Sequence, residues 1–220
     1  MTLVFLASVV VMQTWHGLAG EAATPYVLAS FSTELTRAEW ARNENVGVAA
    51  RKLSGVYLVP GGEFSFNRLV GPRTAAAGYK DAPTFTPLGK LDSLAGGICQ
   101  LSSTIYNAAL LANLQIVERH PHSLTVRYLL PGRDATVSEY ADLRFCNSRQ
   151  GPIRLIVELT GRQLKCTIMG SEPMQEQVAI SVEKRMLATG LVVTRTFREV
   201  HGAGGIERAL VSEDTYVPSY

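Results

Sequence analysis

The sequence predicts an α+β fold, in which one helix packs on an antiparallel sheet and a small β-rich extension follows at the C-terminus. Three observations support this class. A stretch near the middle of the chain has the apolar spacing of a helix, whereas most other segments alternate apolar and polar residues between glycine- and proline-containing turns. In addition, 220 residues that are 46% hydrophobic and 18% charged suit one sizeable core with an appendage.

Residues 1–23 have the character of a targeting segment. An apolar run from Leu3 to Met12 is followed by small residues, which is typical of a signal peptide, although no basic residue precedes the run. The run is too short to cross a membrane comfortably, so the alternatives are a short anchor or an ordinary buried segment. We expect an extracytoplasmic protein whose membrane attachment, if any, is made through this segment alone.

The next part of the chain predicts two strands around a helix. Pro25 to Leu35 is rich in β-forming residues, and Val56 to Val59 has the pattern of a buried strand. Between them, a short amphipathic helix is expected to begin with Asn43 or Asn45 as its cap and to end at Gly55.

A turn at residues 60–62 precedes two aromatic residues that flank a serine. Phe64 and Phe66 either anchor this segment to the core, or they present Glu63, Ser65 or Asn67 to a substrate. Beyond this segment we expect one helical turn at residues 75–80, a short strand at 84–86 and an open loop at 87–95.

The predicted central helix covers residues 98–113. Its apolar positions form a stripe of mostly small side chains, which can approach a sheet closely. Cys99 lies off this stripe, on a polar face that it shares with Ser102, Ser103 and Tyr106. The apolar stripe consists of Leu101, Ile105, Ala108, Ala109 and Ala112.

Two glycines, Gly96 and Gly97, place Cys99 in the first turn of this helix. Unsatisfied backbone N–H groups and the positive end of the helix dipole favour a thiolate there, which is the reactive form of cysteine. The alternative is that Cys99 is a small buried residue that fills space.

The second half of the chain predicts an antiparallel sheet and then the extension. We expect strands at residues 114–117 and 124–130, followed by a three-stranded meander at 140–147, 153–159 and 163–169. Residues 24–172 would form the main domain, and residues 173–220 the extension. The extension is expected to contain strands at 178–182, 191–197 and 206–211, a flexible turn at 202–205 and an exit segment at 214–218.

Charge, cysteine content and histidine content exclude several classes. The net charge of +2 is scattered, with no basic run that would indicate nucleic-acid binding. Cys146 and Cys166 would occupy the outer strands of the meander, too far apart for a disulfide. His120 and His122 would share one face of an extended segment, where they suit catalysis, substrate binding, a structural hydrogen bond or a metal. Carboxylates to complete a metal site are missing from the pattern, so we expect no metal and no cofactor.

Several motifs in fixed order, spanning roughly residues 26–170, resemble the VanW family. The resemblance implies a bacterial envelope-associated protein, linked with vancomycin-resistance gene clusters, whose partner is peptidoglycan or its precursors. A histidine followed by serine is part of the family pattern, which favours His122 over His120, and Ala95 stands where the first of three glycines is usual. The motifs are Gly62–Asn67, Val70–Thr74 with Gly78–Tyr79, Gly96–Ala109, Glu118–Ser123 and Gly132–Val137.

The order of the chemical groups also resembles the layout of transglutaminase-like and papain-like cysteine enzymes. That resemblance implies that the Cys99 thiolate attacks a carbonyl, His122 transfers the proton and Asp134 orients the imidazole. Asp142 and Asn147 are alternative orienting residues. The residues expected to contact substrate are Glu63, Asn67, Arg73, Gln100, Ser102, Ser103 and His120.

Two hypotheses follow from the sequence. The first is a Cys-His hydrolase or transferase that acts on peptide, amide or ester bonds of the cell wall. The second is a non-catalytic peptidoglycan-binding or scaffolding module, in which Cys99 only fills space between the helix and the sheet.

Overall fold

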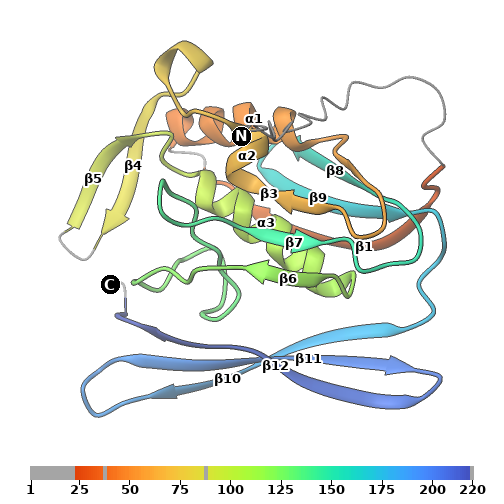
Figure 1. The fold of residues 1–220 in the computed structure, drawn as a ribbon. Coiled ribbons are helices and arrows are strands. Elements are labelled where there is room, and N and C mark those ends of the chain that lie inside the picture. Colours follow the sequence, from red (N-terminus) through yellow and green to blue (C-terminus); the bar gives the residue numbers. More distant parts are fainter. Residues whose placement is uncertain (1–22, 37–38, 87–88, 219–220) are drawn as a thin grey trace, which may run out of the picture.

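The structure is a computed structural model that describes residues 23–36, 39–86 and 89–218. The targeting segment expected at residues 1–23 lies almost entirely outside the described residues. The predicted α+β class is confirmed, because helices pack on separate antiparallel sheets (Figure 1).

A four-stranded antiparallel sheet, with the order β1-β9-β8-β2, forms one layer of the core. Its strands are β1 (Tyr26–Glu34), β9 (Gln163–Gly170), β8 (Ile153–Thr160) and β2 (Tyr57–Leu58). The first half of β8 alternates buried and partly exposed residues, as expected for a strand with one face on the core. All four strands were predicted within one residue of their observed bounds.

Two helices cover this sheet. The α3 helix (Ile98–Leu111) packs on β1 and β9, and α1 (Trp40–Leu53) packs on β8 and against α3. The start of α3 is as predicted. The two predicted caps of α1 are four and six residues too late, because Asn43 and Asn45 lie inside the helix and Glu39 precedes it as N-cap without a capping side-chain bond.

A second sheet lies on the opposite side of α3 and has the order β3-β7-β6 (Figure 1). Its strands are β3 (Glu63–Ser65), β7 (Arg144–Cys146) and β6 (Gln115–Glu118). Phe64 and Phe145 stack across it with ring centroids 4.5 Å apart. The prediction that Phe64 anchors its segment to the core is therefore confirmed. A short helix, α2 (Phe66–Val70), follows β3 directly.

Because α3 lies between two sheets, every one of its residues is buried except Cys99 and Leu111. The polar face predicted from helical spacing therefore faces protein instead of solvent. Its hydroxyl and amide side chains are satisfied by hydrogen bonds to neighbouring backbone, as buried polar groups require.

The predicted three-stranded meander is wrong. Only β8 and β9 form a hairpin, because the chain leaves the second sheet after β7 and crosses to the first. Asn147 fixes this crossover by donating hydrogen bonds to the carbonyl oxygens of Leu58 and Gly151, both at 3.0 Å. Cys146 and Cys166 consequently belong to different sheets, and all three cysteines of the chain are free.

Residues 87–95 were predicted as an open loop, but most of them form a strand. The hairpin of β4 (Asp81–Thr86) and β5 (Gly89–Leu94) projects away from the core (Figure 1). Ahead of it, Ala75–Ala77 form the predicted single helical turn, as a 3-10 helix. The strand expected at residues 124–130 is absent, and that segment is irregular apart from a single bridge at Leu124.

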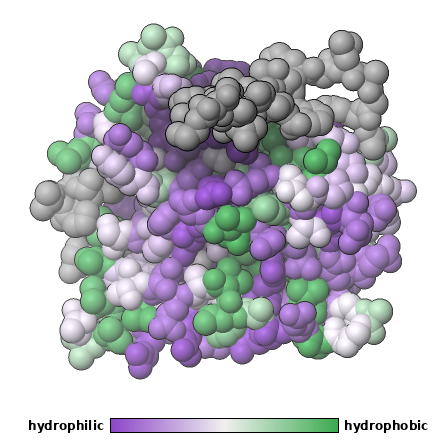
Figure 2. Space-filling view, in the orientation of Figure 1, coloured by the Kyte–Doolittle hydropathy of each residue, from purple (hydrophilic) through white to green (hydrophobic). Residues whose placement is uncertain are grey.

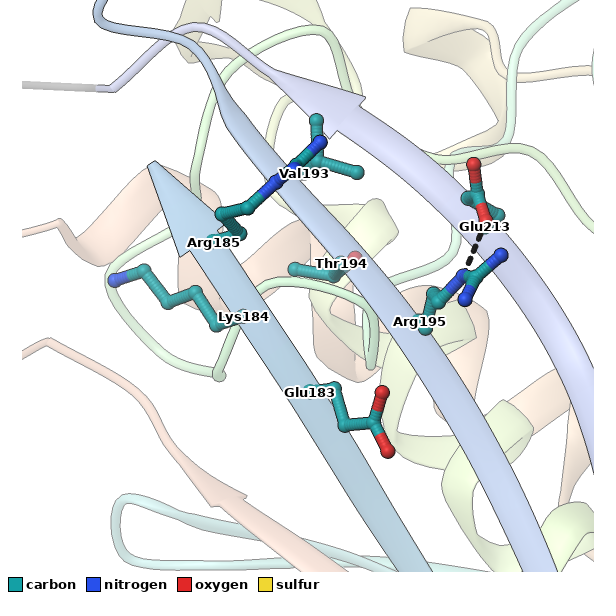
Figure 3. Close-up of a pocket in the computed structure, with 7 residues that line it drawn as sticks. All are labelled: Glu183, Lys184, Arg185, Val193, Thr194, Arg195 and Glu213. Carbon is teal, nitrogen blue, oxygen red and sulfur yellow. Dashed lines mark hydrogen bonds and ion pairs between the residues drawn. The ribbon is translucent and has the colours of Figure 1, made fainter. Parts of the chain in front are cut away.

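The C-terminal extension is a three-stranded meander of β10 (Gln177–Met186), β11 (Val192–Gly202) and β12 (Gly205–Tyr216). It lies along the lower edge of the main domain in Figure 1. Figure 3 shows charged side chains on its outer surface, including the cross-strand pair Arg195–Glu213. The predicted exit segment is wrong in part, because Asp214–Tyr216 complete β12 and two of these residues are buried.

On the face shown in Figure 2, hydrophilic and hydrophobic residues are interspersed, with the hydrophobic ones in small separate groups. Among the helices that the structure describes, none has the length and apolar character needed to cross a bilayer.

Candidate active site

Cys99 is the second residue of α3 and is partly exposed. Two glycines make this placement possible. Gly97 is the N-cap residue with φ 101°, in the left-handed region that favours glycine. At Gly96, a Cβ atom would lie 2.3 Å from the carbonyl oxygen of Ala82, so only glycine fits against the β4 backbone.

Asn45 fixes the approach to this helix from inside α1. The side chain is fully buried and donates to the carbonyl oxygens of Lys80 at 2.9 Å and Gly96 at 3.0 Å. It also accepts a hydrogen bond from the Lys80 N–H at 2.8 Å. Three hydrogen bonds from one amide therefore hold the two ends of the β4–β5 hairpin against α1, just before Cys99.

The Cys99 thiol lies between an imidazole and a backbone carbonyl. The sulfur is 3.5 Å from the carbonyl oxygen of Val137, and the side chain is hydrogen-bonded to His122. Burial raises the pKa of Cys99, but the hydrogen bond and positive charge of His122 outweigh it, helped by the Val137 backbone and the charge of Arg73, so the net pKa is lowered. The environment therefore favours the thiolate.

His122 connects Cys99 to a carboxylate. Its Nδ1 lies 2.6 Å from Oδ2 of Asp134, which leaves Nε2 for the bond to the thiol. Burial lowers the pKa of His122, yet the hydrogen bonds to Asp134 and Cys99 and their negative charges raise it to about 9. Both shifts favour a thiolate beside an imidazolium over the neutral thiol and imidazole.

Asp134 is completely buried and has every lone pair directed at a donor. Oδ2 accepts from both His122 groups, the ring and the backbone N–H at 2.7 Å. Oδ1 accepts from the Tyr216 hydroxyl at 2.7 Å and from Arg119 Nη2 at 3.2 Å. Burial raises the pKa of Asp134, but His122 and Arg119 lower it further than burial raises it. Asp134 therefore remains a carboxylate.

The two alternative orienting residues lie elsewhere. Asp142 accepts hydrogen bonds from the Ser65 hydroxyl at 2.6 Å and from the Asn67 N–H at 2.9 Å, at the start of α2. The Asn147 side chain donates to the Leu58 and Gly151 carbonyl oxygens, where the chain crosses from one sheet to the other. The imidazole of His122 is bonded to Asp134, so of the three residues considered only Asp134 is in position to orient it.

Sequence reasoning missed three residues that surround Asp134. Arg119 lies between two carboxylates, and its Nη1 is 2.6 Å from both oxygens of Asp214. Tyr216 donates to Asp134 from β12. Arg119 belongs to the same short motif as His120 and His122, which was a usable signal, but Asp214 and Tyr216 were assigned to an exit segment and carried none.

Three of the predicted substrate-contacting residues are buried within the protein. Gln100 donates to the Thr33 hydroxyl at 3.1 Å and to the carbonyl oxygen of Glu34 at 2.9 Å, which ties α3 to β1. Ser102 and Ser103 hydrogen-bond to the Ala135 backbone at 2.6 and 2.9 Å. Ser102 and Ser103 therefore hold the segment after Asp134 against the helix. All three side chains are buried, where a substrate could not reach them.

Glu63 and His120 belong to a partly exposed ionic cluster. Arg144 pairs with Glu63 at 2.9 Å and with Glu118 at 3.2 Å, and His120 Nε2 lies 3.0 Å from Glu118. His120 is therefore directed at Glu118, whereas His122 is directed at Asp134. The predicted preference for His122 as the partner of Cys99 agrees with this geometry.

Arg73 and Asn67 lie on the other side of the thiol. Arg73 Nη2 donates to the Asn67 side-chain oxygen, and the guanidinium is close enough to Cys99 for their charges to interact. Arg73 Nε is buried and, among the described residues, has no hydrogen-bond partner. Arg73 thus keeps one donor without a partner among the described residues, and its charge acts on the Cys99 thiol.

Other features of the surface do not point to a second centre. Two shallow hollows involve the C-terminal sheet, one lined by the charged residues of Figure 3 and one beside β6, and Cys99 lines neither. Within the described ranges, His, Cys, Asp and Glu side chains form no group of three or more that could hold a metal ion.

Comparison with known proteins shows that most residues of the candidate site lie in the part of the chain that matches a protein family. A family model described as VanW like protein matches residues 41–169. The uncharacterized protein YoaR of Bacillus subtilis (strain 168) is 36% identical over 152 residues, which cover 69% of this chain and 50% of that protein. The Vancomycin B-type resistance protein VanW of Enterococcus faecalis (strain ATCC 700802 / V583) is 33% identical over 128 residues, or 54% of this chain and 46% of that protein.

The chain therefore spans about half the length of the curated relatives that it matches. No solved structure matches it. The matched region includes Cys99, His122 and Asp134 but ends before β10.

Proposed function

The chain belongs to the VanW-like protein family, and we propose that it is a cysteine-dependent hydrolase or acyltransferase of the bacterial cell envelope. One observation carries the proposal: at the N-terminus of a buried helix, His122 is close enough to Cys99 to lower the pKa of its thiol, and the same imidazole is bonded to Asp134 at 2.6 Å. A nucleophile, a base and an orienting carboxylate in this relation are the elements of nucleophilic acyl transfer.

The first chemical step is attack by the Cys99 thiolate on a substrate carbonyl. A carbon–sulfur bond forms as the carbonyl π electrons move to oxygen, which becomes an oxyanion. The Cys99 backbone N–H in the first helical turn and the free Arg73 Nε are the donors available to this oxygen. Both are fixed before the substrate arrives, so little reorganisation is needed.

In the second step the carbon–nitrogen bond breaks and the His122 imidazolium protonates the leaving amine. A thioester on Cys99 and a neutral His122 remain. His122 then removes a proton from water or from an acceptor amine, whose attack releases the acyl group and restores the thiolate. Water gives hydrolysis and an amine gives transfer. Asp134 holds the imidazole in one tautomer and stabilises its charged form throughout.

The proposed substrates are peptide or amide bonds of peptidoglycan or its precursors. Support comes from the family, since the Enterococcus faecalis relative is named for vancomycin resistance. We also propose an extracytoplasmic location, which the same family and the signal-like character of residues 1–23 support. The order of Cys99, His122 and Asp134 along the chain is also that of transglutaminase-like and papain-like enzymes, a similarity of layout that supports the reaction type alone.

Selective thiol labelling tests the proposal directly. Native protein is treated with iodoacetamide at pH 7, and modification of each cysteine is followed by mass spectrometry. We expect Cys99 to be modified much faster than Cys146, a matched control of similar partial exposure. Cys166 is buried, and burial raises its pKa to about 12, so it should react only after unfolding. Equal rates at Cys99 and Cys146 would contradict an activated thiol.

Turnover is then measured with purified peptidoglycan and its soluble fragments. Release of new amino groups or of cross-linked products by the unmodified chain should be lost in Cys99→Ala and in His122→Ala. Cys146→Ala is the control and should retain activity. Activity that persists in folded Cys99→Ala would refute a cysteine mechanism.

A non-catalytic peptidoglycan-binding or scaffolding module is the second candidate. The observation in its favour is that Cys99 packs against the hydrophobic core as well as against His122. This function predicts that Cys99→Ala binds sedimented peptidoglycan as well as the unmodified chain does, with no turnover by either. Loss of turnover with retained binding would instead support the enzyme.

A further inference from the structure

The C-terminal extension contacts the proposed site at Asp134, which is completely buried. Tyr216, the last residue of β12, is almost completely buried, and its hydroxyl has four hydrogen-bond partners in and around the Asp134 carboxylate, three of them at 3.2 Å or less. It donates to Asp134 Oδ1 at 2.7 Å and accepts from the Gly132 N–H at 2.9 Å and from Arg119 Nη2 at 3.2 Å. One hydroxyl therefore fixes the carboxylate, the turn before it and the arginine beside it.

The turn that delivers Asp134 is also held by β11. Thr196 donates from its hydroxyl to the Gly132 carbonyl oxygen at 3.0 Å. Gly132 has φ 90°, and a Cβ atom there would lie 2.6 Å from the Thr196 hydroxyl oxygen. A side chain at position 132 would clash with Thr196, so the turn can lie this close to the extension only because residue 132 is glycine.

The segment that follows His122 is held by the same strand end. The N–H of Val217 donates to the Ser123 carbonyl oxygen at 2.8 Å, and the N–H of Thr125 donates to Val217 at 3.1 Å. These bonds make a parallel bridge between Val217 and Leu124. Residues at the end of β12 consequently hold the chain on both the histidine side and the aspartate side of the pair.

From these contacts we infer that the C-terminal sheet contributes to the active site. Its residues Tyr216 and Thr196 are positioning residues that hold Asp134 toward His122. This inference rests on the proposed function, since it concerns the same Cys99–His122–Asp134 series. It goes beyond the family match, which ends at residue 169, before either positioning residue.

The expected effect is on the ionisation of Cys99, because a loosely held Asp134 no longer stabilises the His122 imidazolium. Other charged and titratable groups near the series stay in place in the test. They are Arg73, Tyr106, Arg119, Tyr128 and Asp214. Variants that alter neither charge nor shape therefore isolate the positioning effect.

The experiment measures iodoacetamide labelling of Cys99 against pH in the full chain. Tyr216→Phe and Thr196→Val each remove one hydroxyl. We expect both to move the labelling midpoint upward, by about one pH unit for Tyr216→Phe, which makes labelling about tenfold slower well below the midpoint. Rates should converge at high pH, where every thiol is ionised. A loss of packing alone would not produce this pH dependence.

Matched controls come from exposed positions. Tyr140→Phe alters a tyrosine that is 88% exposed, and Thr215→Val alters the exposed residue between Asp214 and Tyr216 on β12. Both should follow the unmodified curve. Near-UV circular dichroism checks folding, and if Tyr216→Phe does not fold, Thr196→Val decides.

The outcomes separate this inference from the proposed function. If His122→Ala raises the midpoint but folded Tyr216→Phe and Thr196→Val do not, the positioning role is wrong and the proposed function stands. If the unmodified chain already labels like an ordinary thiol and His122→Ala changes nothing, the proposed function fails and the inference fails with it.

Discussion

His122 and Asp134 are joined twice through one oxygen: Oδ2 of Asp134 lies 2.6 Å from His122 Nδ1 and 2.7 Å from the His122 backbone nitrogen. The backbone bond fixes the position of the residue, and the ring bond fixes the orientation of its imidazole. A carboxylate used in this way controls both the geometry and the charge of the base.

Replacement of this carboxylate gives the first prediction. In Asp134→Asn, His122 loses its anionic partner, so its pKa falls from about 9 toward its ordinary value and Cys99 loses thiolate character. We expect turnover to fall on the order of 10⁴-fold, the loss found when the orienting aspartate of a Ser-His-Asp triad is replaced by asparagine. Steady-state rates and Cys99 labelling at pH 7 measure both effects.

Asp142→Asn is the control for that variant. Asp142 is a neighbouring carboxylate bonded to Ser65 and Asn67 instead of to a histidine. It should leave the pH dependence of Cys99 labelling unchanged. A similar loss in both variants would mean that general electrostatics, and not orientation of His122, explains the effect.

A bell-shaped pH profile of kcat/KM is the second prediction. The rising limb reports ionisation of Cys99, whose pKa is lowered, so it should lie below that of a free thiol. The falling limb reports loss of the His122 proton near pH 9, because a neutral imidazole cannot protonate the leaving amine. Rates on peptidoglycan fragments from about pH 5 to 10 test this. A rate that keeps rising beyond about pH 10 would exclude His122 as the acid.

Gly96→Ala tests the close approach that places the thiol. The new methyl group would meet the Ala82 carbonyl at 2.3 Å, and backbone cannot move aside as a flexible side chain can. We expect a loss of about 1–3 kcal/mol in the free energy of unfolding, the usual cost of overpacking, together with slower Cys99 labelling. Urea denaturation measures the first quantity. Gly204→Ala, where nothing lies within 4 Å, is the control and should be near neutral.

Ala95→Gly should stabilise the protein. Ala95 has φ 62°, in the left-handed region that costs a residue with a Cβ about 1–2 kcal/mol. Part of that gain is offset by the greater freedom of glycine in the unfolded chain, so we expect a net increase of about 0.5–1 kcal/mol in the free energy of unfolding. The control is Asn113→Gly at φ 57°, with a smaller gain because asparagine tolerates this region. Destabilisation by Ala95→Gly would show that the Ala95 methyl group contributes more packing than its backbone costs.

The sequence predicted the parts of the site that depend on local structure. Gly96 and Gly97 mark the start of α3 because a helix N-terminus pressed against a strand requires residues without side chains. The family pattern of a histidine followed by a serine favoured His122 over His120, and the structure directs His122 at Asp134. The unusual alanine at position 95 was visible as a departure from a glycine run, and its positive φ explains why glycine is usual there.

The rest depended on contacts between distant segments. Asp214 and Tyr216 were read as an exit segment because a short polar stretch before a proline gives no local sign that its partners lie more than 80 residues earlier. The strand β5 was missed because Leu91 and Leu94 are exposed, so these apolar residues do not mark a buried face. The prediction of a three-stranded meander was wrong because the chain crosses to the other sheet at Asn147, where the Asn147 side chain bonds to Leu58 and Gly151.

The four charged groups around Arg119 have no net charge when His122 is protonated. Arg119 and protonated His122 supply two positive charges, and Asp134 and Asp214 supply two negative ones, all with side chains at most 19% exposed. Removal of one member leaves a net charge in a place where water compensates it poorly. Redesign of this site, or its divergence among related proteins, should therefore proceed by coupled replacements, such as Arg119→Met together with Asp214→Leu, instead of by single steps.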